Sequence, residues 1–259
     1  MGYALVTGAS KGIGKAIAAE LAKRKYDILL VARSQDLLVE TAAAIAKQFG
    51  VKTSCLAIDL SLPGAATELY EWCTKNNFAI EILVNNAGYG LSGPFEKYND
   101  EEYTAMMQVN MNTLVSLCHY FLPGMKKLQQ AFVLNIGSTA AYQSVPGLAL
   151  YAASKSFVVS FSRSLCYELR NTAVSVTCVC PGSTDTDFVN RANMSSKTKK
   201  TALKFNMTPE AVALIAVNAM FKKKTEVIVG GLNKLGAFLV WLLPQSVVEK
   251  NIASLYDMN

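Results

Sequence analysis

The sequence predicts an α/β fold in which helices cover both faces of one doubly wound parallel sheet of about seven strands. Short apolar runs rich in β-forming residues alternate with longer amphipathic segments, a pattern typical of βαβ units. The runs are almost continuously apolar, as expected for strands buried on both sides. A glycine-rich loop connects the first run to the first amphipathic segment. Together these observations predict a parallel sheet.

Strands and helices are expected to alternate along the chain. The expected strands are residues 3–7, 27–32, 52–58, 82–85, 131–136, 173–179 and 226–229. The expected helices are residues 13–25, 34–49, 64–77, 100–127, 152–170 and 208–222. Two helix starts have suitable chemistry, because Asn99 or Asp100 can cap one helix and Pro209 occupies the first position of another.

Two stretches interrupt the alternation. Residues 183–206 are polar and rich in lysine, which indicates a loop over a site. The segment after the last strand is first apolar and then amphipathic, which indicates one or two additional helices. With 259 residues, no internal repeat and no low-complexity linker, the chain is expected to form a single domain.

Composition argues against several classes of function. The formal net charge is +6, but aromatic side chains do not interleave with the lysine clusters as they would on a nucleic-acid-binding surface. The only histidine is His119, which argues against a zinc site and against a Ser-His-Asp hydrolase. We therefore expect no nucleic-acid partner and no bound metal.

Cysteine usage and hydropathy bear on localisation. The six cysteines include no C-x-x-C pair and lie in apolar stretches, which indicates buried free thiols in a reducing compartment. The chain opens on an expected strand instead of a secretory signal, and no stretch reaches the roughly 18 apolar residues of a membrane span. We therefore expect a cytoplasmic protein without a transmembrane segment.

The most informative chemical feature is Tyr151 followed four residues later by Lys155, with Ser138 upstream. Residues four apart share one face of a helix, so the phenol would lie beside the ammonium group. A nearby cation lowers the pKa of a tyrosine from about 10 and suits it to acid–base catalysis near neutral pH. Ser138 can supply a hydroxyl that holds a carbonyl oxygen. Alone, the pair also fits a solvated helix face, so its meaning depends on the rest of the chain.

The first expected strand continues into a loop with the sequence TGASKGIG at residues 7–14. Glycines permit a tight turn and let the backbone approach a pyrophosphate, while the N-terminus of the next helix meets the phosphate charge. The spacing G-x-x-x-G-x-G lacks the Gly-Lys-Ser/Thr ending of a P-loop. The loop therefore predicts dinucleotide binding, with contacts from Gly8, Ser10, Lys11, Gly12, Ile13 and Gly14.

Arg33, at the carboxyl end of the second expected strand, bears on the choice of cofactor. A free 2′-hydroxyl on the adenosine ribose prefers an acidic residue near this point, whereas a 2′-phosphate prefers an arginine. No carboxylate lies between Asp27 and Asp36, and Lys11 lies in the adjacent loop. Because both cations can contact a phosphate, we expect NADP(H) in preference to NAD(H).

With these motifs in order, about residues 3–231 resemble a classical short-chain dehydrogenase/reductase. The run NNAG at residues 85–88 matches the motif that follows the fourth strand in this family. The resemblance implies a catalytic set made up of Asn110, Ser138, Tyr151 and Lys155. It implies further cofactor contacts from Asp59, Leu60, Asn86, Ala87, Gly88, Tyr151, Lys155, Pro181, Gly182 and Thr186. Departures at Thr113 and at residues 183–184 are expected to affect local packing and the shape of the nicotinamide pocket, and not the chemistry.

The resemblance also implies a role for each catalytic residue. Tyr151 would give its proton to the carbonyl oxygen during reduction, or remove it during oxidation. Lys155 would lower the pKa of Tyr151 and hydrogen-bond the nicotinamide ribose. Ser138 would orient and polarise the carbonyl, and Asn110 would hold the helix geometry and a water that relays protons towards Lys155. The implied reaction interconverts a carbonyl and a secondary alcohol.

Side chains that follow strand ends or adjoin the catalytic residues are apolar or aromatic, and ligands of open α/β sheets bind beyond the carboxyl ends of the strands. We therefore expect an apolar small-molecule substrate, such as a ketone, a 3-ketoacyl chain or a steroid-like molecule, with contacts from Tyr89, Tyr142 and Phe188. A non-catalytic NADP-sensing module and a sugar-nucleotide epimerase are the alternatives. The first would usually lack a catalytic residue, and the second usually needs a larger C-terminal domain.

We assign residues 1–231 to one Rossmann-type domain for catalysis and cofactor binding, and residues 232–259 to a helical tail packed on that domain or on a partner subunit. The tail resembles that of a branch of the family with an extended C-terminal segment. Its apolar run FLVWLL at residues 238–243 would be a costly exposed patch in a monomer. The tail can serve as a lid, an oligomer contact or a weak contact with a membrane surface. The resemblance implies a homodimer or homotetramer.

Overall fold

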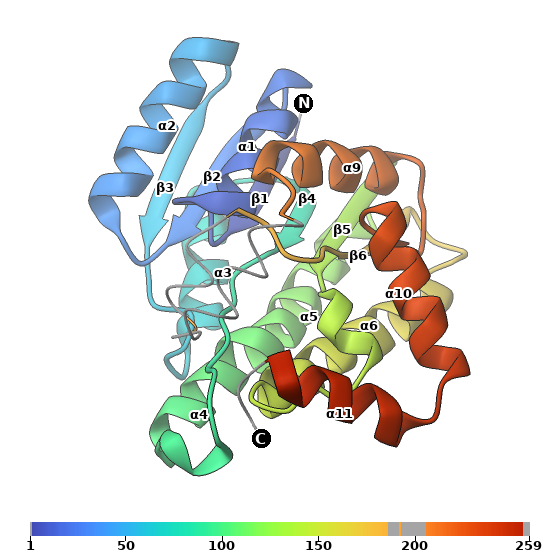
Figure 1. The fold of residues 1–259 in the computed structure, drawn as a ribbon. Coiled ribbons are helices and arrows are strands. Elements are labelled where there is room, and N and C mark those ends of the chain that lie inside the picture. Colours follow the sequence, from blue (N-terminus) through green and yellow to red (C-terminus); the bar gives the residue numbers. More distant parts are fainter. Residues whose placement is uncertain (1, 186–191, 193–205, 256–259) are drawn as a thin grey trace.

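The structure is a computed structural model that describes residues 2–185, 192 and 206–255. Seven strands form one sheet in the order β3-β2-β1-β4-β5-β6-β7. All neighbouring strands pair in parallel, which confirms the expected doubly wound α/β fold (Figure 1). The strands are β1 Tyr3–Thr7, β2 Asp27–Ala32, β3 Thr53–Ala57, β4 Ile80–Asn85, β5 Ala131–Ile136, β6 Val174–Cys180 and β7 Glu226–Ile228.

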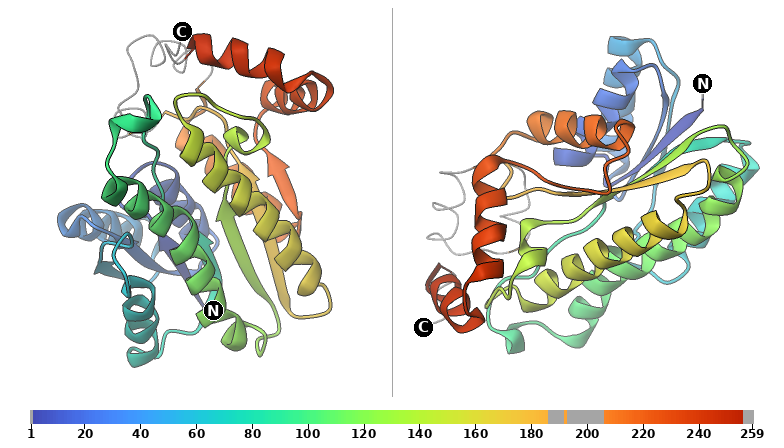
Figure 2. Two further views of the ribbon diagram at one scale, coloured as in Figure 1. Left: turned by 90° about the horizontal axis from the view of Figure 1, so that it is seen from below. Right: turned by 90° about the vertical axis from the view of Figure 1, so that its right-hand side faces the viewer.

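Helices cover both faces of the sheet (Figure 2). One face carries α1 (Gly12–Lys23), α2 (Gln35–Phe49) and α9 (Pro209–Phe221). The other carries α3 (Ala65–Lys75), α5 (Thr113–Met125) and α6 (Ala149–Glu168). Successive strand residues alternate between these faces, so Val6 packs in the first core and Leu5 in the second. This double coverage is why the strands are apolar at nearly every position.

The expected helix over residues 100–127 is divided into three parts. α4 (Asp100–Met107) is followed by the π-helical turn η2 (Gln108–Asn112), which leads into α5. π-turns often occur at functional sites, and this one carries Asn110. Hydrophobic periodicity alone does not reveal the turn, because the chain stays helical on both sides of it.

The topological switch of the sheet lies between β1 and β4, whose following connections lead to opposite sides. Thr7 and Asn86 join the carboxyl ends of these two strands. The Thr7 hydroxyl donates to the Val84 carbonyl at 3.1 Å, and the Asn86 amide donates to the Thr7 carbonyl at 2.9 Å. Ligands of open α/β sheets bind at such a switch point, so this edge is the place to look for a site.

A buried ladder of amides and a hydroxyl fixes α6 against the middle of the sheet. Asn85 Nδ2 donates to Asn135 Oδ1 at 2.9 Å, and Asn135 Nδ2 donates to Ser162 Oγ at 2.9 Å. The ladder crosses from β4 through β5 to α6, and all three side chains are buried. Buried polar groups must be paired to avoid a desolvation penalty, so the ladder sets the position of α6 on the sheet.

Two helices, α10 (Gly231–Leu242) and α11 (Gln245–Leu255), follow the last strand. The right-hand view of Figure 2 places both beside the carboxyl edge of the sheet. α11 packs on the domain through Val248 and Ile252, whereas α10 has no fully buried residue and leaves Trp241 77% exposed. Within the described part of the chain, no helix combines the length and apolar character needed to cross a membrane.

Candidate active site

The loop after β1 forms a cradle in which only glycine fits. Gly8 and Gly12 adopt positive φ values of 66° and 58°, the left-handed region that favours glycine. A Cβ at Gly14 would lie 2.3 Å from the Gly8 carbonyl oxygen, so the loop and the start of α1 are in close contact. The cradle leaves the N-terminus of α1 open towards a ligand phosphate. These residues therefore fit the pyrophosphate of a dinucleotide.

The cations expected at the adenosine end of the cofactor lie at the carboxyl end of β2. The Ala9 amide donates to the Val31 carbonyl at 3.2 Å, which places the loop carrying Lys11 beside the strand that leads to Arg33. Arg33 Nη1 lies 3.8 Å from Asp59 Oδ2, and its side chain is 55% exposed. This arrangement can offer a guanidinium to a phosphate while it keeps the carboxylate close by.

Asp59 and Leu60 follow β3 and have distinct local roles. Asp59 Oδ1 accepts from the amide and the hydroxyl of Ser61, at 3.0 and 2.7 Å, which holds the turn after the strand. Leu60 is buried, and its carbonyl accepts from the hydroxyl of Thr113 at 2.8 Å. Thr113, which departs from the usual family residue, thus ties α5 to this turn.

Three hydrogen bonds, two to the Tyr89 backbone and one to Ser154, hold the Asn110 side chain at the carboxyl end of β4. Its Nδ2 donates to the Tyr89 carbonyl at 2.9 Å and to Ser154 Oγ at 3.0 Å, and its Oδ1 accepts from the Tyr89 amide at 3.1 Å. A Cβ at Gly88 would lie 2.8 Å from Asn110 Oδ1 and 3.6 Å from Lys155 Nζ. Asn110 and Lys155 therefore flank the same glycine.

Tyr151 and Lys155 lie on the first two turns of α6 and are both buried. Lys155 Nζ is 5.8 Å from the centre of the Tyr151 ring and donates to the Ile136 carbonyl at 2.8 Å. Burial lowers the pKa of Lys155 to about 8, against a smaller opposing effect of Cys178 and Cys180. A buried ammonium so close to a phenol can assist proton transfer at that phenol.

Ser138 lies just beyond the end of β5 and caps the short 3₁₀ turn η3 (Thr139–Tyr142). Its Oγ accepts from the Ala140 amide at 3.1 Å, and Ser156 Oγ on α6 donates to the Ala141 carbonyl at 2.7 Å. η3 is therefore fastened to the helix that carries Tyr151 and Lys155. The structure thus gathers all four residues of the expected catalytic set at the carboxyl edge of β4 and β5.

Pro181 and Gly182 continue directly from β6 beside this edge. The Thr139 amide donates to the Pro181 carbonyl at 2.9 Å. A Cβ at Gly182 would lie 2.4 Å from Asn233 Nδ2, so α10 closes over this segment. Thr186 and Phe188, which were expected to contact the cofactor and the substrate, lie outside the described residues.

The two described tyrosines expected in the substrate pocket face different surroundings. Tyr89 packs against a small apolar cluster around Tyr151 that includes Met106, Val145 and Leu148. The Tyr142 hydroxyl instead donates to Glu226 Oε1 at 2.7 Å. Tyr89 therefore lies beside Tyr151, whereas the hydroxyl of Tyr142 is bound to Glu226 of β7.

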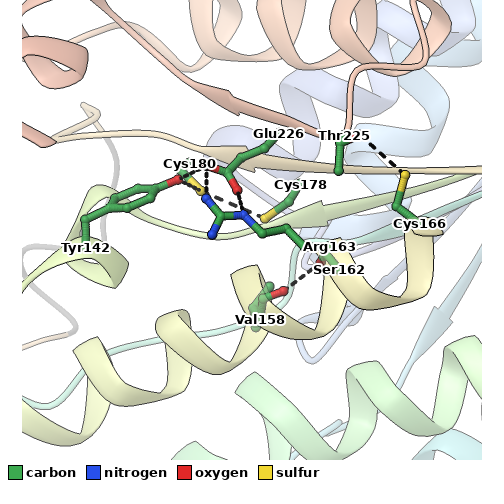
Figure 3. Close-up of polar contacts among 9 residues, drawn as sticks. All are labelled: Tyr142, Val158, Ser162, Arg163, Cys166, Cys178, Cys180, Thr225 and Glu226. Carbon is green, nitrogen blue, oxygen red and sulfur yellow. Dashed lines mark hydrogen bonds and ion pairs between the residues drawn. The ribbon is translucent and has the colours of Figure 1, made fainter. Parts of the chain in front are cut away.

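Sequence reasoning missed three residues that meet Tyr142 at the turn after Ser138, and these are Arg163, Cys180 and Glu226. Figure 3 shows Arg163 and Glu226 meeting Tyr142 and Cys180. Arg163 and Glu226 are 63 residues apart, and no local pattern links them. The sequence feature that comes nearest to indicating these residues is the position of Arg163. It follows Lys155 by eight residues on one helix, so both residues lie on similar faces.

The thiols match the expectation of buried free cysteines in part. All six cysteines are free, and four of them are buried, whereas Cys55 and Cys166 are partly exposed. Within residues 2–185, 192 and 206–255, no group of three or more histidine, cysteine or carboxylate side chains could hold a metal ion.

The family description "short chain dehydrogenase" matches residues 2–197. The chain belongs to the short-chain dehydrogenase family. Together with the reductases and dehydrogenases among its relatives, this membership makes the chain an oxidoreductase that acts on CH–OH or C=O groups.

Two relatives show the range of this short-chain dehydrogenase's similarity. Ketoacyl reductase HetN of Nostoc sp. is 32% identical over 227 residues, which cover 87% of this chain and 77% of the relative. Very-long-chain 3-oxoacyl-CoA reductase of Anas platyrhynchos is 38% identical over 186 residues, which cover 69% of this chain and 58% of the relative. The match thus spans little more than half of that second relative.

Solved structures give the same fold. A short-chain dehydrogenase from Sphingobium yanoikuyae in complex with NADPH superimposes with a TM-score of 0.83 at 27% identity, covering 96% of this chain and 95% of that one. A short-chain dehydrogenase/reductase from Burkholderia phymatum in complex with NAD has a TM-score of 0.82 at 21% identity, covering 92% of each chain. Chains of this fold therefore bind nicotinamide cofactors of both kinds.

Proposed function

We propose that the protein is an NADP(H)-dependent oxidoreductase that interconverts a ketone and a secondary alcohol on an apolar substrate, with Tyr151 as the general acid and base. One observation carries the proposal. Tyr151 and Lys155 lie buried together at the carboxyl edge of the sheet, where the cofactor cradle, Ser138 and Asn110 also lie. A satisfied structural tyrosine would not need a buried cation beside it, because burying that cation carries a desolvation penalty.

Each residue would have a defined part in the reaction. Ser138 would donate its hydroxyl to the carbonyl oxygen and orient it. Tyr151 would protonate that oxygen as it gains negative charge, and Lys155 would favour the phenolate that remains. Asn110 would hold the widened turn that brings Lys155 and Gly88 together. The cofactor, when bound, supplies the hydride, while the chain supplies position and electrostatics.

The preference for NADP(H) rests on Arg33 and Lys11. Both extend from the end of the switch region at which the adenosine ribose of a bound dinucleotide would lie. An arginine at this place can bind a 2′-phosphate through a charge-assisted contact. The NADPH complex of the Sphingobium relative is in keeping with this choice.

An apolar substrate is supported by the side chains that surround Tyr151. Met106, Val145 and Leu148 are buried there, and Ile252 of α11 packs against the same cluster. A long or bulky apolar group beside the reacting carbonyl would suit such a lining. The tail helix α11 would then act as part of the pocket wall. Ketones, 3-ketoacyl chains and steroid-like molecules all fit this description.

We further infer that the enzyme works in the cytoplasm as a homodimer or homotetramer. The outward side of α10 presents apolar side chains that a monomer would leave in water, among them Phe238 and Trp241, whose rings stack 6.2 Å apart. Contact with a second subunit would cover them. The described cysteines are all free, which suits a reducing compartment.

The test is an assay of NADPH and NADH consumption with a panel of ketones and 3-ketoacyl thioesters, for the wild type and for Tyr151→Phe. The variant lacks only the acidic hydroxyl, so kcat should fall by roughly 10²–10⁴-fold. NADPH affinity, measured by fluorescence titration, should change little. Undiminished turnover by Tyr151→Phe would refute the acid–base role, and cofactor binding without turnover of any substrate would favour a cofactor-sensing module.

A further inference from the structure

A polar cluster that the proposed reaction does not use includes the last residue of η3, the turn that follows Ser138. It consists of Tyr142, Arg163, Cys180 and Glu226, and is called the Tyr142 cluster below. Figure 3 shows these side chains converging from the turn η3, the helix α6 and the strands β6 and β7. Four separate elements thus meet within one set of polar contacts.

The Glu226 carboxylate is the centre of the cluster. Its Oε1 accepts from the Tyr142 hydroxyl at 2.7 Å and from Arg163 Nη2 at 2.9 Å. Arg163 Nε donates to the other carboxylate oxygen, so the guanidinium binds in the two-pronged manner that gives charged pairs directional strength. Cys180 Sγ lies 3.3 Å from the Tyr142 hydroxyl. The phenol is therefore held from two sides.

The cluster is half-buried, because Tyr142 and Glu226 are partly shielded from water whereas the Arg163 side chain is 56% exposed. The Glu226 side chain is only 17% exposed, and one guanidinium balances its charge. Burial, the Cys180 thiol and the Glu226 carboxylate all raise the pKa of Tyr142, so the phenol remains a hydrogen-bond donor at physiological pH. Removal of one partner would leave a partly buried polar group without its hydrogen bond, which costs stability.

The turn η3, which follows Ser138, is held by contacts at its start and at its end. Ser138 precedes η3 and Tyr142 is its last residue. At the first end, the Ser138 amide donates to the Cys180 sulfur, and the neighbouring Thr139 amide donates to the Pro181 carbonyl at 2.9 Å. At the second end, Tyr142 is tied to Glu226. A turn of four residues fixed at both ends can move very little.

We propose that Tyr142, Glu226 and Arg163 are positioning residues that fix the catalytic hydroxyl of Ser138 relative to Tyr151. Arg163 belongs to the same helix as Tyr151 and Lys155, so the cluster relates the serine turn to the catalytic helix through β7. The inference rests on the proposed function, in which Ser138 holds the carbonyl oxygen. Small misplacements of such groups cost large factors in rate, since reaction requires near-ideal geometry.

The first experiment compares Tyr142→Phe with Tyr167→Phe, an exposed tyrosine on the far part of α6 that serves as the matched control. The change at Tyr142 removes one hydroxyl and keeps the ring. We expect kcat to fall about 5- to 20-fold, by the geometric sensitivity of positioned groups, while the Kd for NADPH stays within about twofold. The control should match the wild type. A kcat for Tyr142→Phe within about twofold of the wild type would overturn the proposal.

The second experiment uses conservative rescue at Glu226. Glu226→Gln keeps an oxygen that can accept from Tyr142, whereas Glu226→Leu removes every acceptor. We expect the glutamine variant to retain most of the kcat and the leucine variant to resemble Tyr142→Phe. A purely structural role predicts the opposite pattern, in which both variants lower the melting temperature and neither changes kcat in the folded enzyme.

Hydrogen exchange measured by mass spectrometry keeps the test independent of turnover. Amides of residues 137–145 should exchange faster in Tyr142→Phe than in Tyr167→Phe, because the second end of the turn has been released. Equal exchange rates in the two variants would contradict the proposal that the Tyr142 cluster restrains the turn η3. If the wild type turned over no carbonyl substrate, the proposed function would fail, while the exchange comparison would still decide whether the cluster restrains the serine turn.

Discussion

Lys155 is the residue whose chemistry depends most on its surroundings. It is 6% exposed, and its ammonium contacts the Ile136 carbonyl instead of water. Burial lowers its pKa from 10.5 to about 8. A lysine tuned in this way can change its charge close to physiological pH, which a surface lysine does not do. The sequence predicted that Lys155 lies beside Tyr151, but only the packing around α6 shows that its ammonium group is buried away from water.

The lowered pKa leads to a prediction about stability. Below pH 8 both the folded and the unfolded chain hold the Lys155 proton, so burial of the charge costs stability in full. Between about pH 8 and 10.5 the unfolded chain binds more protons, so this cost declines as the pH rises. Lys155→Met should therefore raise the free energy of unfolding by about 1–3 kcal/mol at pH 7 in the cofactor-free protein.

Urea unfolding of wild type and Lys155→Met at several pH values checks this prediction. The difference in the free energy of unfolding between the two proteins should be largest at or below pH 8 and should shrink towards pH 10.5. Lys47→Met, on the exposed side of α2, is the control and should give no gap with this pH dependence. A gap that widens with rising pH would mean that the lysine is not held in a desolvated site.

Arg33 carries a prediction about cofactor choice. Its replacement by serine removes the cation that the 2′-phosphate of NADPH would meet, but leaves the site for the 2′-hydroxyl of NADH intact. Arg33→Ser should raise the KM for NADPH by roughly tenfold or more, as for the loss of a charge-assisted contact, and should change the KM for NADH only slightly. Steady-state kinetics with both cofactors provides the measurement.

The matched control for this substitution is Arg170→Ser. Arg170 is also exposed, but it stacks on Tyr167 at the C-terminal end of α6, away from the cofactor cradle. It should leave both KM values unchanged. Equal losses for NADPH and NADH in Arg33→Ser would show that the arginine supports the fold of this edge and does not discriminate between cofactors.

At the scale of elements, the site is built where the ends of several elements meet. The β1–α1 loop, the turn after β4, the π-helical turn η2 and the first turns of α6 all reach the carboxyl edge of the sheet. Each is fastened there by contacts between residues far apart in sequence, such as Asn86 with Thr7 and Asn110 with Ser154. The expected single helix over residues 100–127 is instead broken at Asn110, where a widened turn brings the amide between Tyr89 and Ser154.

The β1–α1 loop carries an element-scale prediction. A Cβ at Gly14 would press on the backbone of Gly8 at 2.3 Å, and backbone cannot swing aside as a side chain can. Gly14→Ala should therefore shift the start of α1 and weaken NADPH binding by about tenfold or more, because the phosphate cradle loses its shape. Fluorescence titration with NADPH measures the change.

Gly124→Ala is the matched control for the loop variant. Gly124 lies inside α5, is exposed, and a Cβ there meets nothing within 4 Å. The same substitution should leave cofactor affinity unchanged and stabilise the helix by about 0.5–1 kcal/mol. If Gly14→Ala bound NADPH as tightly as Gly124→Ala, the cradle would not be the cofactor site.

At the scale of the whole molecule, the two tail helices behave differently. α11 packs on the apolar cluster around Tyr151 through Ile252, so it belongs to the wall of the proposed pocket. The outward side of α10 instead presents leucines at heptad spacing, and these are Leu232, Leu235, Leu239 and Leu242. Such spacing is typical of a helix that packs along another helix. A monomer would leave this row of four leucines, called the α10 seam below, exposed to water.

The α10 seam leads to a prediction about assembly. Leu239→Lys places a charge in the middle of this row of leucines and should shift the proposed oligomer towards the monomer, because a buried unpaired charge disfavours the contact. Leu214→Lys on α9 is the control, since Leu214 is 46% exposed and Leu239 is 44% exposed. Light scattering after size-exclusion chromatography gives the masses. The same mass for both variants would contradict a subunit contact, and binding of the wild type to anionic vesicles would then assign α10 to a membrane surface.

The sequence by itself determined the parts of this protein that depend on local order. Alternating apolar runs and amphipathic segments predicted the parallel sheet, because a strand covered on both faces must be apolar throughout. The glycine loop predicted a dinucleotide cradle, since only glycine tolerates its backbone. Tyr151 and Lys155 were predicted to act together because a spacing of four residues places them on one helix face, with Ser138 upstream.

Only the tertiary structure decided how these parts are held. It brought Glu226 from the edge strand to Tyr142 and Arg163, turned the Tyr142 hydroxyl towards β7, and divided the helix at Asn110. It also covered the cluster around Tyr151 with α11 and left the leucines of α10 outside. Contacts of this kind join residues tens of positions apart, and their energy depends on burial and direction, which no local pattern in the chain records.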